Sequence, residues 1–135
     1  MIKTVSIVCS IWALLMVCSC KKGPGEGGNS SVYGTVNTIL YSNSAFIDPI
    51  DTFPAADEDV FIIYGDDVSF GDKTQTNYEG KFEFKYLREG SYKIYVYSKG
   101  PRDVYPSGDY AVIKGVDING KKKNIDAGLF EIMDE

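Results

Sequence analysis

The sequence of 135 residues contains no histidine, and this absence removes a large part of enzyme chemistry. Without an imidazole there is no histidine general base, no Ser-His-Asp triad and no imidazole ligand for a metal ion. A hydrolase built on two carboxylates would need two acids in different environments within one cleft. The 19 acidic residues stand in turns or at outward strand positions, so we expect no enzymatic activity and no cofactor.

Cysteine is scarce as well, since the chain has three, at Cys9, Cys18 and Cys20. Cleavage of the chain before Cys20 would leave one cysteine in the mature protein. A chain with a single thiol forms no internal disulfide and no thiolate metal cluster. Acidic residues crowd both ends of the strand expected at 59–65, but their spacing does not match an EF-hand loop. Oxygen-rich turns can bind calcium, but solvated turn carboxylates are the favoured interpretation, so we expect no metal site.

Basic residues are fewer than acidic ones, 14 against 19, and the formal net charge is −5. Arginine occurs only at Arg88 and Arg102. Binding of nucleic acid is dominated by the neutralisation of phosphates, which an acidic protein with so few arginines does not achieve. The composition therefore excludes nucleic acid as an expected partner.

The first 19 residues have the organisation of a signal peptide. Lys3 supplies a positive charge, and the apolar run from Val5 to Val17 is too short to span a bilayer as a stable helix. The end of this run, Val17-Cys18-Ser19-Cys20, resembles the lipobox of bacterial lipoproteins. In that family a peptidase cuts before a cysteine that follows a small residue, and the cysteine carries a diacylglycerol on its sulfur. The resemblance implies cleavage after Ser19 and lipidation of Cys20.

An ordinary secretory signal with an incidental cysteine is the alternative interpretation of this end of the chain. It would leave an unpaired thiol in an oxidising compartment, which is unusual. Several acyl chains on Cys20 would instead hold the protein on a membrane, because each buried methylene contributes about 0.8 kcal/mol. We expect a membrane as the partner of the N-terminus.

Residues 21–31 read KKGPGEGGNSS, with glycine, proline and serine and without an apolar side chain. This composition buries no surface, so it predicts a flexible tether. A glycine-rich coil of this length averages roughly 18 Å from end to end. The sequence thus divides into a signal peptide at 1–19, a lipidated cysteine with its tether at 20–31, and one domain of ordinary size at 32–135.

Every apolar run in the domain is short, β-branched or aromatic, and bounded by turn formers, which predicts an all-β fold. The pattern is clearest from Thr74 to Val96, where two turns end in Gly80 and Gly90. Large side chains alternate with charged ones on both sides of the second turn. We expect the large ones to point into the core, and they are Phe82, Phe84, Tyr92, Ile94 and Val96.

Two other segments have patterns of their own. Residues 59–65, DVFIIYG, place apolar side chains on both faces, so we expect a strand that is covered on both sides. Residues 42–57 have no steady period but contain Phe46, Ile47, Ile50 and Phe53. We expect a long loop that folds these side chains back onto the domain, either as a lid or as a binding site.

The order of the strand and turn motifs resembles the carboxypeptidase regulatory-like domain. The motifs are Val32-x-Gly34-x-Val36, then Pro54 followed by Val60-x-Ile62, Thr74-x-Thr76-Asn77-x-x-Gly80-x-Phe82, and Leu87-x-x-Gly90-x-Tyr92-x-Ile94-x-Val96. That family recurs in secreted and surface proteins of the Bacteroidetes and has a prealbumin-like, Greek-key β-sandwich of seven strands. The resemblance implies this fold for most of residues 32–132. It implies little about function, because the motifs consist of turn and core residues.

Two functions remain after these exclusions. The first is a non-catalytic, lipid-anchored interaction or spacer module in the cell envelope of a Gram-negative bacterium, at the outer membrane, with an envelope protein as partner. Lys21 and Lys22 lack the acidic stretch that resembles a surface-export signal, which favours the periplasmic face. The second is a glycan or small-ligand module, with Tyr33, Tyr95 and Tyr97 as an aromatic platform beside the 42–57 loop. Strand tyrosines are also ordinary β-formers, so the first function is favoured.

Overall fold

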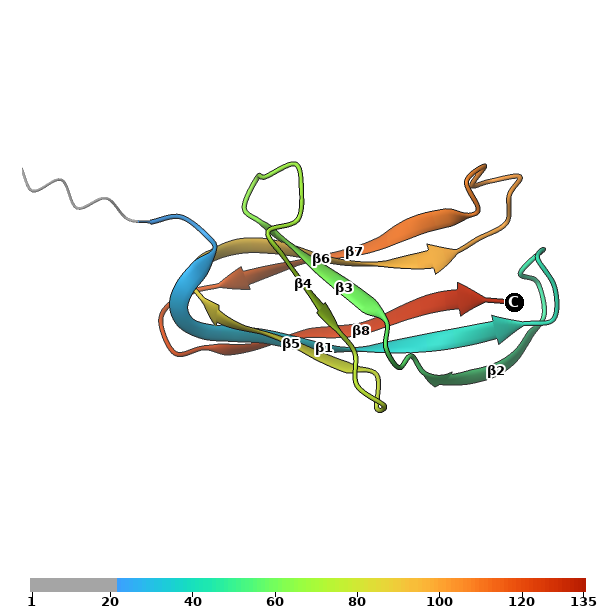
Figure 1. Ribbon diagram of the computed structural model, residues 1–135, viewed down its shortest axis with the longest axis horizontal. Helices are drawn as coiled ribbons and strands as arrows, with labels where there is room; N and C mark the ends of the chain where they lie inside the picture. Colours follow the sequence, from blue (N-terminus) through green and yellow to red (C-terminus); the bar gives the residue numbers. More distant parts are fainter. Residues whose placement is uncertain (1–21) are drawn as a thin grey trace, which may run out of the picture.

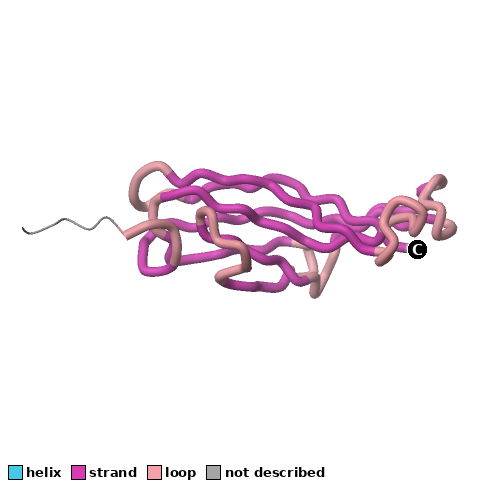
Figure 2. Tube along the Cα trace, turned by 90° about the horizontal axis from the view of Figure 1, so that it is seen from above, coloured by secondary structure: helices cyan, strands magenta, loops and turns pink. Residues whose placement is uncertain are grey.

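The computed structural model describes residues 22–135, which fold into strands and loops without a helix (Figures 1 and 2). The predicted all-β class is confirmed. The strands are β1 (Glu26–Tyr41), β2 (Pro49–Pro54), β3 (Asp59–Tyr64), β4 (Asp72–Gln75), β5 (Lys81–Leu87), β6 (Gly90–Lys99), β7 (Asp109–Ile118) and β8 (Asn124–Asp134).

β1 is the central strand of the first sheet, which we call sheet A. It pairs with β8 in parallel along one edge. Along its other edge it pairs antiparallel with β5 over its first part and with β2 over its last part. The two partners meet at Val36, whose amide donates to the carbonyl of Gly80 at 2.7 Å and whose carbonyl accepts from the amide of Ala55 at 2.9 Å. β1 thus holds three other strands.

Sheet B consists of β4, β3, β6 and β7 in that order, with every pair antiparallel. The two sheets lie face to face, so the described chain forms a two-layered sandwich (Figures 1 and 2). Strand residues alternate between the core and the outer faces, as period-2 geometry requires. The five side chains predicted to point inward from β5 and β6 are all buried. The core is completed by Val32, Val36, Ala55, Val60, Ile62, Leu87, Val116, Ile118, Phe130 and Ile132.

The strand count differs from the expected seven, because the segment predicted as a long loop contains β2. β1 extends beyond the end of its pairing with β5, and the chain turns back to pair with this free edge. Unpaired backbone groups are thereby satisfied. The apolar side chains do not fold back onto the domain, since Ile47, Ile50 and Phe53 are exposed. The prediction of a covering loop over 42–57 is therefore wrong.

The tether also differs from its prediction, because β1 already begins at Glu26 and Ser30 is buried. Backbone pairing replaces the missing apolar side chains in this stretch. The amide of Arg88 donates to the carbonyl of Gly25 at 2.9 Å, and the Tyr92 hydroxyl accepts from the amide of Gly25 at 2.9 Å. The prediction of a flexible segment up to residue 31 is wrong for residues 26–31. The predicted signal peptide and Cys20 lie outside the described residues.

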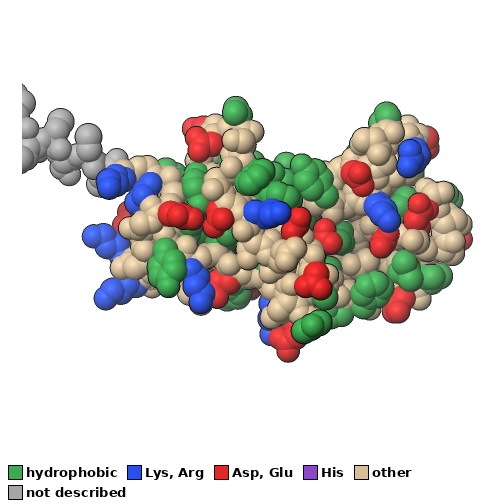
Figure 3. Space-filling view, viewed as in Figure 1, with side chains coloured by type: hydrophobic (Ala, Val, Ile, Leu, Met, Phe, Trp, Pro, Cys, Tyr) green, Lys and Arg blue, Asp and Glu red, His purple; other side chains and the backbone are tan. Residues whose placement is uncertain are grey.

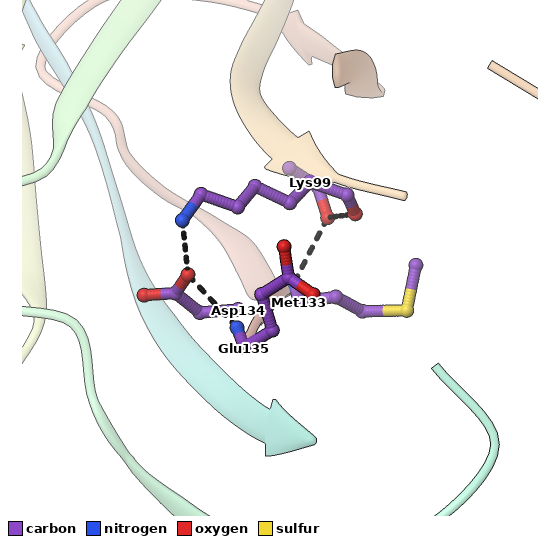
Figure 4. Close-up of polar contacts among 5 residues, drawn as sticks. Lys99, Met133, Asp134 and Glu135 are labelled. Carbon is purple, nitrogen blue, oxygen red and sulfur yellow. Dashed lines mark hydrogen bonds and ion pairs between the residues drawn. The ribbon is translucent and has the colours of Figure 1, made fainter. Parts of the chain in front are cut away.

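Polar contacts fasten the two sheets at the end of the sandwich farthest from Lys22 (Figure 4). Lys99 at the end of β6 forms an ion pair with Asp134 at the end of β8, with 2.5 Å between Nζ and Oδ1. The neighbouring Ser98 hydroxyl accepts a hydrogen bond from the amide of Met133 at 2.8 Å. These contacts connect strands of different sheets, since β6 belongs to sheet B and β8 to sheet A.

The side of the sandwich between β7 and β8 is closed by a charged residue. Lys114 lies on the inward side of β7, with its ammonium group 5.0 Å from the centre of the Phe130 ring. The same ammonium group donates to the carbonyl of Leu129 on β8. A cation over an aromatic face is stabilised by the ring quadrupole. Lys114 therefore occupies the gap between the two edge strands.

Gly80 occupies a position that other residues fill only with backbone strain. Its φ is +72°, and an added Cβ would lie 2.3 Å from the carbonyl oxygen of Val36. We expect Gly80→Ala to destabilise the protein by about 2–4 kcal/mol in chemical denaturation. Gly115→Ala is the matched control, since a Cβ there meets no atom within 4 Å. It should change stability by less than about 1 kcal/mol, and equal effects of the two variants would contradict the junction described at Val36.

Candidate functional site

The strongest candidate site is a group of outward-facing aromatic and apolar side chains on the outer face of sheet B, which we call the outer cluster. It consists of Phe61 on β3, Phe70 in the loop after β3, Tyr95 and Tyr97 on β6, and Ile113 on β7. Figure 3 shows hydrophobic side chains gathered over this part of the sheet. The largest apolar patch on the surface of a monomeric protein is often functional.

The alternation of inward and outward side chains along each strand explains why the strand residues of the cluster face outward. Neighbours of Phe61 and Tyr95 in sequence are buried, so both rings point outward. Register then brings them together, because Phe61 stands opposite Tyr95 and Tyr95 stands opposite Ile113. The loop that carries Phe70 is closed by a hydrogen bond from the amide of Gly71 to the carbonyl of Ile62, at 2.8 Å.

The rings of the outer cluster contact one another closely. Phe61 stacks on Tyr95 with 4.9 Å between ring centres and 9° between ring planes. Phe70 and Tyr97 pack edge-on against Phe61, at 5.0 Å and 5.7 Å. Removal from water raises the pKa of Tyr95 above its ordinary value, and the neighbouring Tyr97 adds to the rise. The centre of the cluster is thus packed, while Phe70, Tyr97 and Ile113 keep about half of their surface exposed, at 49%, 51% and 55%.

The structure brings together two of the three tyrosines proposed as a platform and separates the third. Tyr95 and Tyr97 lie on β6 with 5.6 Å between ring centres. Tyr33 lies on β1 of sheet A, outside the core and 39% exposed. It therefore faces solvent on the opposite side of the sandwich. The three tyrosines form no common platform, because consecutive outward positions on different strands share a face only when those strands belong to one sheet.

Sequence reasoning missed Phe61, Phe70 and Ile113 as members of a site. The signal for Phe61 was present, since the apolar pattern on both faces of 59–65 predicted a covered strand. The cover comes from neighbouring aromatic rings and not from the 42–57 segment. No local sequence pattern indicated that Ile113 and Phe70 belong to a site, because their positions depend on strand pairing and on loop closure.

A second group of apolar side chains lies at the end of the molecule that carries the β1–β2 hairpin. Tyr41 and Phe46 pack edge-on, with 5.4 Å between ring centres. Ile47 and Ile50 are 72% and 62% exposed. These side chains do not extend the outer cluster, since the hairpin belongs to sheet A.

The described residues contain no site with the chemistry of a metal centre. Among residues 22–135, no three acidic or cysteine side chains are placed to hold a metal ion together. Within the same range no helix is long and apolar enough to cross a membrane. Glu58 is partly buried and lies near the carboxylates of Asp59 and Asp134. Burial and the two neighbouring charges raise the pKa of Glu58 above its ordinary value.

No protein-family model matches the chain, and the search of curated proteins finds no match.

The raised pKa of Glu58 predicts a pH-dependent loss of stability. An acid whose pKa is higher in the folded state than in the unfolded state destabilises the fold once the pH is high enough to ionise it. We therefore expect Glu58→Gln to raise the melting temperature at pH 7, and the gain should vanish as the pH falls below the ordinary pKa of 4.5. Glu131→Gln removes an equal charge from an exposed position of β8 and should give a smaller change. A gain from Glu58→Gln that persists at pH 3 would contradict ionisation of Glu58 as its cause.

Proposed function

We propose that the protein is a non-catalytic, lipid-anchored module of the bacterial cell envelope that binds another envelope protein through the outer cluster. The observation that carries this proposal is the packed and half-exposed group of rings at Phe61, Phe70, Tyr95 and Tyr97. Aromatic residues are enriched in the buried centres of protein interfaces. The cluster is held on three paired strands, so it offers a preformed surface that loses little entropy on binding.

The lipid anchor is part of the same proposal and rests on the sequence. Val17 to Cys20 resembles a lipobox, and Gly23, whose carbonyl accepts a hydrogen bond from Arg88, follows Cys20 by three positions. The resemblance to the carboxypeptidase regulatory-like domain supports a prealbumin-like topology and an envelope location, which we propose to be the periplasmic face of the outer membrane. The two-layered sandwich is compatible with that topology.

Binding of a glycan or small ligand at the same cluster is the second candidate. It is favoured by the exposure of Tyr97 and Phe70. It is weakened by the stacking of Phe61 on Tyr95, because sugars bind to open ring faces and these two rings use a face on each other. The 42–57 segment does not contribute, since it lies in sheet A.

The anchor predicts a specific pattern of fatty-acid labelling. When the full chain is expressed in a Gram-negative host, we expect a clickable fatty acid to be incorporated and the protein to fractionate with membranes. Cys20→Ala should abolish both, because the modified sulfur is lost. Cys18→Ala is the matched control and should leave both unchanged. Labelling that survives in Cys20→Ala would contradict the anchor.

The interaction surface predicts where crosslinks form. A photoreactive aromatic residue placed at position 97 should give a discrete protein adduct in intact cells, because Tyr97 stands at the exposed rim of the outer cluster. The same residue at position 33 is the control, since Tyr33 is also exposed but belongs to sheet A. Equal adducts from both positions would contradict the proposal. Specific glycan binding that Tyr97→Ala removes would favour the second candidate.

A further inference from the structure

We propose that the end of the sandwich nearest Lys22 docks on anionic lipid headgroups, so that the domain stands on the membrane with its long axis along the membrane normal. This inference rests on the proposed lipid anchor, because the anchor would bring this end to the bilayer. Figure 3 shows the side chains of Lys and Arg gathered there. We call this surface the basic end and define it by Lys22, Lys121, Lys122 and Lys123.

The lysines of the basic end are free to meet an outside partner. All four are exposed. Among residues 22–135, the ion pairs involve other lysines, at positions 73, 81, 85 and 99. An open groove of about 920 Å³ lies between Lys22 and Lys121. Glu89 and Asp117 also line it. The carboxylate of Asp117 accepts a hydrogen bond from the Ser91 hydroxyl at 2.7 Å.

The loop that carries three of these lysines is fixed to the start of β1. The amide of Lys122 donates to the side-chain oxygen of Asn29 at 3.0 Å, and the amide of Lys123 donates to the Ser30 hydroxyl at 3.0 Å. The carbonyl of Lys123 accepts from the amide of Ser31 at 2.8 Å. These bonds hold the lysines beside the point where the chain enters the fold. These hydrogen bonds therefore fix the position of the lysines relative to the start of the fold.

The start of the fold is clamped as well, which shortens the distance to the anchor. Arg88 donates from Nε to the carbonyl of Gly23 at 2.7 Å and from Nη1 to the carbonyl of Glu26. Pro24 packs against Gly90, where an added Cβ would lie 2.4 Å from the proline ring. Only Lys21 and Lys22 separate Cys20 from this clamp in the sequence. The three residue steps from Cys20 to Gly23 span at most about 11 Å, so a lipid on Cys20 would hold the basic end close to the headgroups.

Charge is segregated along the long axis of the molecule. The bases near the basic end are Arg88 and the four lysines, and Glu26, Glu89 and Asp117 are acids near it. Two further acids, Asp66 and Asp67, follow Gly65, which packs on Pro24. At the opposite end Lys99 and Arg102 are outnumbered by Asp48, Asp51, Asp103, Asp109, Asp134 and Glu135. An anionic surface attracts the first end and repels the second. The protein as a whole is acidic, with a net charge of −5, so attraction depends on orientation.

The test uses the mature chain, residues 20–135, with Cys20→Ser, so that binding is measured without any lipid on the protein. Vesicles of phosphatidylcholine with about 30 mol % phosphatidylglycerol are compared with phosphatidylcholine alone, at an ionic strength of about 0.1 M. We expect sedimentation with the anionic vesicles only. The triple variant Lys121→Ala, Lys122→Ala, Lys123→Ala should weaken partitioning on the order of 100-fold, since each lysine near an anionic surface contributes about fivefold, or about 1 kcal/mol.

The matched control removes three basic residues away from the basic end, with the changes Lys81→Ala, Lys99→Ala and Arg102→Ala. It should bind within about threefold of the parent, and melting temperatures check that both variants fold. An environment-sensitive dye at Asn119→Cys should shift on binding, whereas one at Ser44→Cys, in the turn of the opposite end, should not. Equal binding to neutral vesicles, equal losses in the two triple variants, or a shift at position 44 would overturn the proposal. The result does not depend on lipidation of Cys20, which the fatty-acid experiment tests separately.

Discussion

The fold depends on the backbone pairing of β1 along both of its edges. This strand has 16 residues, more than any other in the described chain, and it carries β8 on one edge and β5 and β2 on the other. Because backbone amides and carbonyls must be paired when buried, the length of β1 determines where its partners can end. The change of partner at Val36 needs a residue without a side chain at position 80, and it places Ala55 in the core.

The surfaces proposed for binding follow from the same arrangement. Burial of alternate residues in β3 and β6 turns Phe61, Tyr95 and Tyr97 outward, and the order of strands in sheet B joins them into one cluster. At the end of the sandwich, pairing of β1 with the loop before β8 brings Lys122 and Lys123 to the start of the fold. The two surfaces are separate, since one lies on a sheet face and the other at an end. A protein partner and a membrane would thus not compete.

Much of the fold could be predicted from the sequence, because period-2 alternation is a local signal. The inward row from Phe82 to Val96 was recognisable for that reason, and all five of its large side chains are buried. The start of β1 and the whole of β2 had no such signal. Their side chains are mostly polar or exposed, and only their backbones are paired. The site was harder to predict than the fold. Tyr33 and Tyr95 are separated because their strands join different sheets, and the pairing of strands that are distant in sequence leaves no local pattern.

Lys114 has a consequence for many copies of the protein. Edge strands such as β7 and β8 are templates for pairing with another chain, and natural sheets protect such edges with inward-pointing charges. A molecule confined to a surface meets its neighbours far more often than one in free solution, and the proposed upright orientation would bring strand edges side by side. Pairing of a second chain into the gap between β7 and β8 would have to displace the ammonium group from the Phe130 ring and from the Leu129 carbonyl. Lys114 would thus oppose pairing of this pair of edges between neighbouring copies held on one membrane.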